Sequence, residues 1–133
     1  MEMVMILPVL TVLFLGIVQF GMVLREHQIV QNAAREGARL SMMPTYSVSQ
    51  WQGNGTSPDT LVKNYVVQYM SQEGITITTS NVTVDQDYSL SSGGVTFSAS
   101  HVTISYTRSP TFGGSYFPTI AYKGEAVFRN LYP

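Results

Sequence analysis

The order of hydrophobic and polar residues divides the chain into a long rod and a small mixed domain. Residues 3–24 form an apolar run of 22 positions without a charge, long enough to cross a bilayer as a helix. Residues 25–43 keep a helical pattern but are more polar. Together they predict one rod of roughly 40 residues, on the order of 60 Å long. Because that length exceeds a bilayer, we expect the rod to lie half in lipid, or to pack against copies of itself.

Small residues along the rod predict close helix contacts. Gly16 and Gly21 lie in the apolar run, where they would let neighbouring backbones approach each other in a bundle. Beyond the run, Ala33, Gly37 and Ser41 recur every four residues. This stripe could pack against the chain's own domain or against another copy, and both can hold along different lengths of the rod.

Other residues of the rod predict a bend, a polar contact and a solvated surface. Pro8 predicts a local kink or a loosened turn, and Gln19 could hydrogen-bond between helices for about 0.6–2 kcal/mol. The charged residues beyond the apolar run would supply the polar surface of the rod: Arg25, Glu26, Arg35, Glu36 and Arg39.

A second, shorter helix follows a polar loop. Pro44 should end the rod, and residues 45–58 form the loop, with Trp51 covering a domain edge or a subunit contact. Apolar residues then recur at helical spacing over 59–72, with Ser57 as N-cap and Gly74 as the C-terminal stop.

From Ile75 the apolar period changes from 3.6 to 2, which predicts strands. Ile75 and Ile77 alternate with threonines, and Val82 and Val84 do the same; residues 85–94 are a turn-rich segment, and 95–108 form the longest strand. The apolar parity switches within that strand, so we expect a bulge or turn near Ser100 and His101. A last strand surrounds 126–128. The fold class is therefore α+β, with three or four mostly antiparallel strands, a rod over 1–43 and a head domain over 44–133.

Composition narrows the chemistry. Seven basic and eight acidic residues leave a net charge of −1, which gives no reason to expect nucleic-acid binding. The absence of cysteine excludes disulfides, thiol catalysis and cysteine-ligated zinc. His27 and His101 belong to no catalytic motif, and Asp85 and Asp87 are interpreted as a hydrophilic turn rather than a calcium loop. We expect no enzyme, no cofactor and no metal site.

The apolar run also raises the question of orientation. It is too long for a secretory signal peptide, and it continues into a helix without a small-residue cleavage site. Basic residues flank it on the C-terminal side, and the positive-inside rule taken alone would leave the head in the cytoplasm. We favour the alternative that a basic leader preceded Met1 and was removed.

The rod resembles a known family. Glu2, Leu7-Pro8 and the NAAREGAR stretch from Asn32 to Arg39 resemble the N-terminal signature of TadE-like proteins, the pilin-like subunits of tight-adherence (Tad) pilus systems. Segments 102–110 and 126–130 are similar to the closing strands of that family. The resemblance implies a type IV pilin-like fold and a structural subunit of a pilus filament that polymerises through its N-terminal helix.

The resemblance also implies site residues and partners. Glu2 would pair with the N-terminal amine of an adjacent subunit, and Arg35, Glu36 and Arg39 would set register across subunits. The partners would be copies of itself, an inner-membrane assembly platform, a separate secretion ATPase, a prepilin peptidase and membrane lipid. The chain would move from the cytoplasmic membrane to the cell surface. The alternatives are a minor TadE-like pseudopilin and a single-pass membrane-anchored binding domain that does not polymerise.

Asn54 and Asn81 both match the N-glycosylation pattern. Chance matches are expected in a chain rich in Asn and Thr, so a glycan is expected only if the source organism glycosylates its surface filaments.

Overall fold

The structure is a computed structural model, and it describes residues 2–43, 57–109 and 118–129, without the side chains of residues 2 and 3. A long helix, α1 (Glu2–Ser41), leads into a head built from a second helix, α3 (Pro58–Gln72), a short 3-10 turn, η1 (Thr79–Asn81), and three strands. The strands are β1 (Val82–Ser92), β2 (Val95–Arg108) and β3 (Ile120–Arg129). The predicted α+β class is confirmed.

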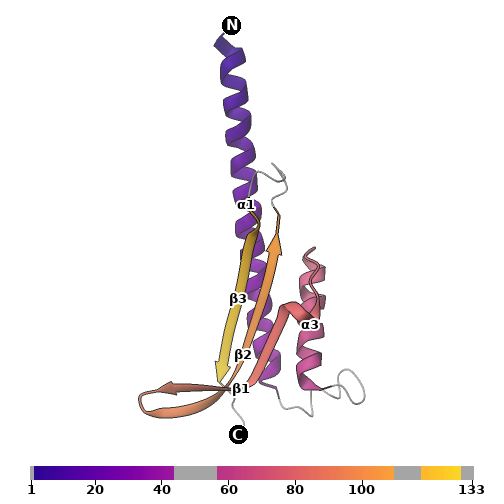
Figure 1. The fold of residues 1–133 in the computed structure, drawn as a ribbon, viewed down its shortest axis with the longest axis vertical. Helices are drawn as coiled ribbons and strands as arrows, with labels where there is room; N and C mark the ends of the chain where they lie inside the picture. The colour runs from indigo at the N-terminus through magenta and orange to yellow at the C-terminus, as the bar shows by residue number, and fades with distance from the viewer. Residues whose placement is uncertain (1, 44–56, 110–117, 130–133) are drawn as a thin grey trace.

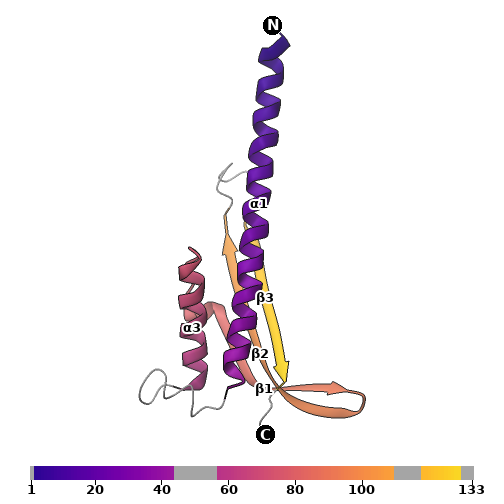
Figure 2. The same cartoon turned by 180° about the vertical axis from the view of Figure 1, so that it is seen from behind.

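The head has two layers. The strands form an antiparallel meander in the order β1-β2-β3. Both helices lie on one face of this sheet, with α3 beside the C-terminal half of α1, while the N-terminal half of α1 extends beyond the head (Figure 1 and, from behind, Figure 2). The molecule is therefore a small sandwich at one end of a rod.

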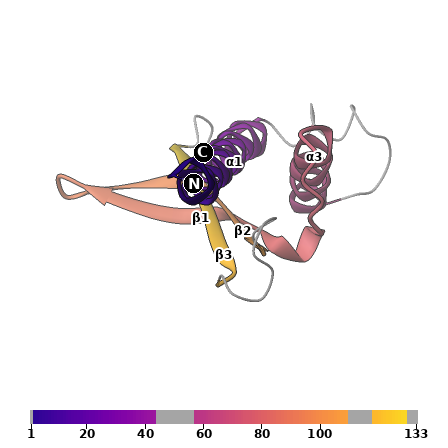
Figure 3. The same cartoon turned by 90° about the horizontal axis from the view of Figure 1, so that it is seen from above.

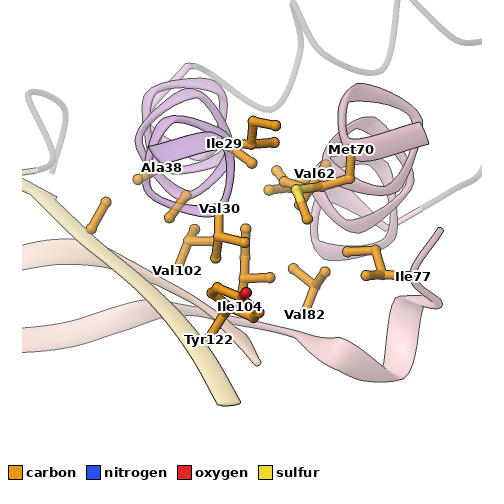
Figure 4. Packing of buried hydrophobic residues seen from close by; sticks show 14 of the residues in the cluster. Ile29, Val30, Ala38, Val62, Met70, Ile77, Val82, Val102, Ile104 and Tyr122 are labelled. Atoms are coloured by element: carbon orange, nitrogen blue, oxygen red, sulfur yellow. The ribbon is translucent and has the colours of Figure 1, made fainter. Parts of the chain in front are cut away.

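The core lies between these layers. Val30 and Ala38 of α1, Val62 and Met70 of α3, and Ile104 of β2 are buried and converge in Figure 4. The inward residues of α1 are small, which lets the helix lie close to the sheet. At the closest point a Cβ on Gly124 of β3 would lie 2.6 Å from the carbonyl oxygen of Val30. Only glycine fits there.

The second helix begins and ends where the sequence predicts. Pro58 occupies the first turn after Ser57, and Gly74 adopts a left-handed φ of 82° just after the helix. The amide of Ile75 then donates to the carbonyl of Met70. The alternation at Ile75 and Ile77 does not form a strand, because η1 and its capping box at Thr78 turn the chain before β1 begins. Ile75 and Ile77 still contribute to the core.

The turn predicted over 85–94 is also wrong. β1 continues to Ser92, and only Gly93 and Gly94, with φ of 62° and 80°, form the turn into β2. Positive φ at both central residues is typical of the type I′ turn that joins hairpin strands. The expected irregularity exists, but it lies on β1: the register shifts between Asp85 and Tyr88, while β2 passes through Ser100 without a break.

Past this bulge the hairpin leaves the rest of the sheet and projects sideways from the head (Figures 1 and 3). We call residues 88–99 the arm. No helix lies over the arm in these views.

Candidate subunit-assembly site

The N-terminal half of α1 is an uncovered apolar cylinder. Most of its large hydrophobic side chains from Val4 to Leu24 are exposed, and nothing lies within 4 Å of a Cβ built on Gly16 or Gly21. In length and composition α1 is a candidate membrane span, and its most apolar window is not covered by any other part of the structure. The helix is continuous through Pro8, and the Thr11 hydroxyl donates to the Leu7 carbonyl at 2.8 Å. This surface suits either lipid or other helices.

The small-residue stripe of the C-terminal half faces the chain's own head. Ala33 is fully buried, and a Cβ on Gly37 would lie 2.6 Å from Cγ2 of Val66 in α3. Ser41 is partly buried and its hydroxyl donates to the carbonyl of Ala38 at 2.8 Å. Of the two alternatives for this stripe, packing within the subunit is the one the structure contains.

The opposite side of the same half is a polar stripe that faces outward. Its members recur at alternating spacings of three and four, all are exposed, and they are Arg25, Gln28, Asn32, Arg35 and Arg39. Glu36 lies beside them, partly exposed. Within the described part of the chain, no ion pair involves Glu36 or the three arginines. We call these five residues the arginine stripe.

Glu26 is not part of the polar surface, and that prediction is wrong. Its side chain is only 11% exposed and pairs with the guanidinium of Arg108 at the end of β2. Burial, followed by a hydrogen bond to Glu26, raises the pKa of Tyr122 to about 12. The pKa of Tyr106 is raised by burial and by the charge of Glu26. These four side chains close the head where the apolar half of α1 leaves it.

Sequence patterns contained a signal for this cluster. Glu26 lies four residues before Val30, on the helix face that carries the buried stripe, and Arg108 shares the core-facing parity of Val102 and Ile104. A charged residue on a buried face calls for a partner of opposite charge.

Gln19 lies just above this cluster. It lines a small cavity with Met22, Val23, Glu26 and Arg108, and its Oε1 atom is buried without a hydrogen-bond partner in the described structure. Gln19 is thus a predicted assembly residue of the apolar half that contacts the margin of its own head.

A second charged cluster lies on the sheet face that points away from the helices. His101 Nε2 lies 2.8 Å from Glu125 Oε1, and Lys123 Nζ lies 3.1 Å from Glu125 Oε2. Hydrogen bonds from Lys123 and then from His101 lower the pKa of the Glu125 carboxyl. Among the described residues, no three His, Cys, Asp or Glu side chains are grouped to hold a metal ion.

The helix that carries both halves also carries the family relationship. Residues 1–39 match the TadE-like protein family. The match covers the apolar half, Glu26 and the arginine stripe to its last member, Arg39. No curated protein and no solved structure matches the chain.

Four further residues singled out in the sequence remain, and three of them lie outside the described structure. The side chain of Glu2 lies outside the described structure, as do Trp51 and the glycosylation candidate Asn54. The other candidate, Asn81, is partly buried, and its Nδ2 donates to the carbonyl of Ser105 at 3.0 Å while its Oδ1 accepts from the amide of Thr78.

Proposed function

We propose that the chain is a structural subunit of a type IV-related, Tad-like pilus, which polymerises through α1. The observation that carries this proposal is the uncovered apolar half of a helix whose sequence is TadE-like. The head leaves that half free and closes its own core around the other half.

The proposed assembly step exchanges lipid for protein around the apolar half. Lipid tails are as apolar as the side chains, so packing and polar contacts must favour the bundle. Open surfaces at Gly16 and Gly21 would admit a neighbouring backbone, whereas the Oε1 atom of Gln19 is buried within the subunit and is not open to another copy. Extraction from the membrane would draw on a separate secretion ATPase and an assembly platform, after a prepilin peptidase has processed the chain.

Glu2 would set the axial register. A carboxylate inside a membrane segment costs roughly 2.5–3.5 kcal/mol, which pairing with the N-terminal amine of an adjacent copy would offset. The subunit would then pass from the cytoplasmic membrane to the cell surface.

The test is electron microscopy of filaments sheared from cells, with mass spectrometry of the purified material. We expect this chain to dominate the filaments. Glu2→Ala should remove it from them without lowering its level in the membrane, and Glu73→Ala, at an exposed position on the head, is the matched control. Filaments that contain Glu2→Ala at the normal level would refute the pairing role.

The length of α1 also favours a second candidate, a single-pass membrane-anchored domain or minor pseudopilin. A chain that stays in the membrane fraction, and is scarce or missing in sheared filaments, would establish this candidate in place of the first.

A further inference from the structure

The arm has one apolar face and one polar face. Residues directly opposite each other in an antiparallel pair share a face. Leu90 pairs with Phe97 and Tyr88 with Ala99, so these four side chains lie together, followed by Val95. The other face carries only hydroxyl side chains, which are Ser89, Ser91, Thr96 and Ser98.

The apolar face of the arm points away from the helices of its own subunit. β2 is continuous, and its core residues Val102 and Ile104 have the opposite parity to Val95 and Phe97. Because side chains alternate between faces along a strand, the apolar side of the sheet changes at this point. The bulge in β1 makes the same change, so that Tyr88 and Leu90 lie with Phe97. The parity switch in the sequence therefore marks the point where the apolar side chains of β2 pass from one face of the sheet to the other.

That face is largely uncovered. Val95 is 52% exposed, and Tyr88 and Leu90 are each 39% exposed. The guanidinium of Arg129 lies 4.1 Å above the centre of the Phe97 ring, and the His101 ring lies 4.8 Å from that of Tyr88. A two-stranded ribbon is marginally stable in water by itself. The arm thus presents a surface that a partner would stabilise.

Charge indicates which partner. Asp85 and Asp87 are exposed at the root of the arm, and neither forms an ion pair within the described residues. Among the described residues, the arginines without an ion pair are three members of the arginine stripe, Arg25, Arg35 and Arg39, and also Arg129, which lies over the Phe97 ring. That stripe faces away from the sheet, whereas Asp85 pairs with His101 on the sheet face opposite the helices. One copy therefore keeps the two charge sets on opposite sides, and only two copies can bring them together.

We propose that the arm of one copy docks on the arginine stripe of a second copy. This contact rests on the proposed function in taking another copy as the partner. Asp85 and Asp87 pair with Arg35 and Arg39 of the second copy, and the apolar face covers the aliphatic stems of those arginines. The contact of Arg129 with Phe97 shows that this face accepts a guanidinium. The filament proposed above requires the head-to-tail form of this contact, in which each copy docks on the next instead of exchanging arms within a two-fold dimer.

The chain has no cysteine, so paired cysteine substitutions report this contact directly. The full-length variant Leu90→Cys/Asn32→Cys is expressed in the host cells, oxidised, and analysed on non-reducing gels from membranes and sheared filaments. We expect a ladder of disulfide-linked dimers, trimers and larger species. Each single variant should give no ladder, and Ser91→Cys/Asn32→Cys is the matched control because Ser91 lies on the hydroxyl face.

Charge reversal gives an independent measurement in the same cysteine pair. Asp85→Arg/Asp87→Arg should lower the ladder yield by at least about tenfold, because it places like charges together. Adding Arg35→Asp/Arg39→Asp should restore most of that yield.

The outcomes separate this contact from the proposed function. Filaments without a ladder from Leu90→Cys/Asn32→Cys would overturn the arm contact and leave the filament subunit intact. A ladder in membranes of cells that make no filaments would support the contact and refute the filament function. Dimers from Leu90→Cys alone would show that arms meet arms, which overturns the proposed pairing.

Discussion

The two halves of α1 belong to one uninterrupted helix, but they differ in what lies against them. Around Gly16 and Gly21 there is open space, whereas Gly37 lies so close to Val66 that an added methyl group would overlap it. Helical propensity treats these glycines alike, at about 1 kcal/mol less favourable than alanine. The difference teaches that a glycine in α1 serves one of two purposes. It admits the subunit's own head or leaves room for something outside the subunit.

Replacing these glycines with leucine should give the largest difference between the two halves of α1. Gly37→Leu adds a branched side chain where the first carbon already lies 2.6 Å from Val66, and we expect a loss of about 1–3 kcal/mol or more in head stability. Gly16→Leu should leave head stability unchanged and lower the amount of chain in filaments. Thermal unfolding in detergent and hydrogen exchange of β2 amides measure the first effect, and sheared-filament yield measures the second. Equal melting temperatures for the two variants would contradict the comparison.

The boundary between the halves is the ion pair of Glu26 and Arg108. Arg108→Ala leaves the Glu26 carboxylate mostly buried without its cation. We expect a cost of about 1–3 kcal/mol, below that of a fully buried pair because Arg108 is 44% exposed. The control is Lys63→Ala, which breaks a partly exposed pair with Asp59 on α3 and should cost at most about 1 kcal/mol. Denaturant titration of the two variants compares them; a smaller loss for Arg108→Ala than for Lys63→Ala would refute the boundary role.

The cluster at this boundary should also make the stability of the head depend on pH in the alkaline range. Tyr122 has a pKa of about 12 against an ordinary value of 10.0, so the folded head holds this proton more tightly than the unfolded chain does. Its contribution to stability is complete below pH 10 and is lost as the pH rises from 10 towards 12. Tyr122→Phe should flatten the fall of stability in that window. The measurement is the melting temperature as a function of pH, and an unchanged slope would contradict it.

The sequence predicts the elements of this fold well where one pattern acts alone. Helical spacing with Pro58 and Gly74 at its ends locates α3 to within a residue. It fails where a tertiary contact decides. Ile75 and Ile77 alternate as a strand would, yet they fill the core from outside the sheet. The serine-rich residues 88–92 pair with β2 because the two glycines after them make a tight turn.

Burial of a charge is the other limit of prediction. When each helix residue is judged by its own polarity, Glu26 is predicted to lie on the surface. Arg108 is predicted only to end a strand. Only the crossing of α1 over the sheet brings them together, and a contact between residues 82 positions apart has no signature in local spacing. The sequence shows that the apolar residues of β2 change parity at Ser100. It does not show whether β2 contains a bulge there or whether the apolar side of the sheet changes face, because that depends on which strand carries the extra residue of the bulge.

The smallest expected effect concerns the outward side of the packed half. Arg35→Ala/Arg39→Ala removes two exposed cations that make no ion pair with the described head, so we expect a change in its unfolding free energy of at most about 0.5 kcal/mol. If this stripe serves assembly, the same variant should lower filament yield while the melting temperature stays constant. Arg108→Ala provides the contrast, since it should lower the melting temperature. A large loss of stability in the stripe variant would show that the outward side of the packed half also supports the head. The two halves of α1 would then still differ, but the packed half would have no side free for another copy.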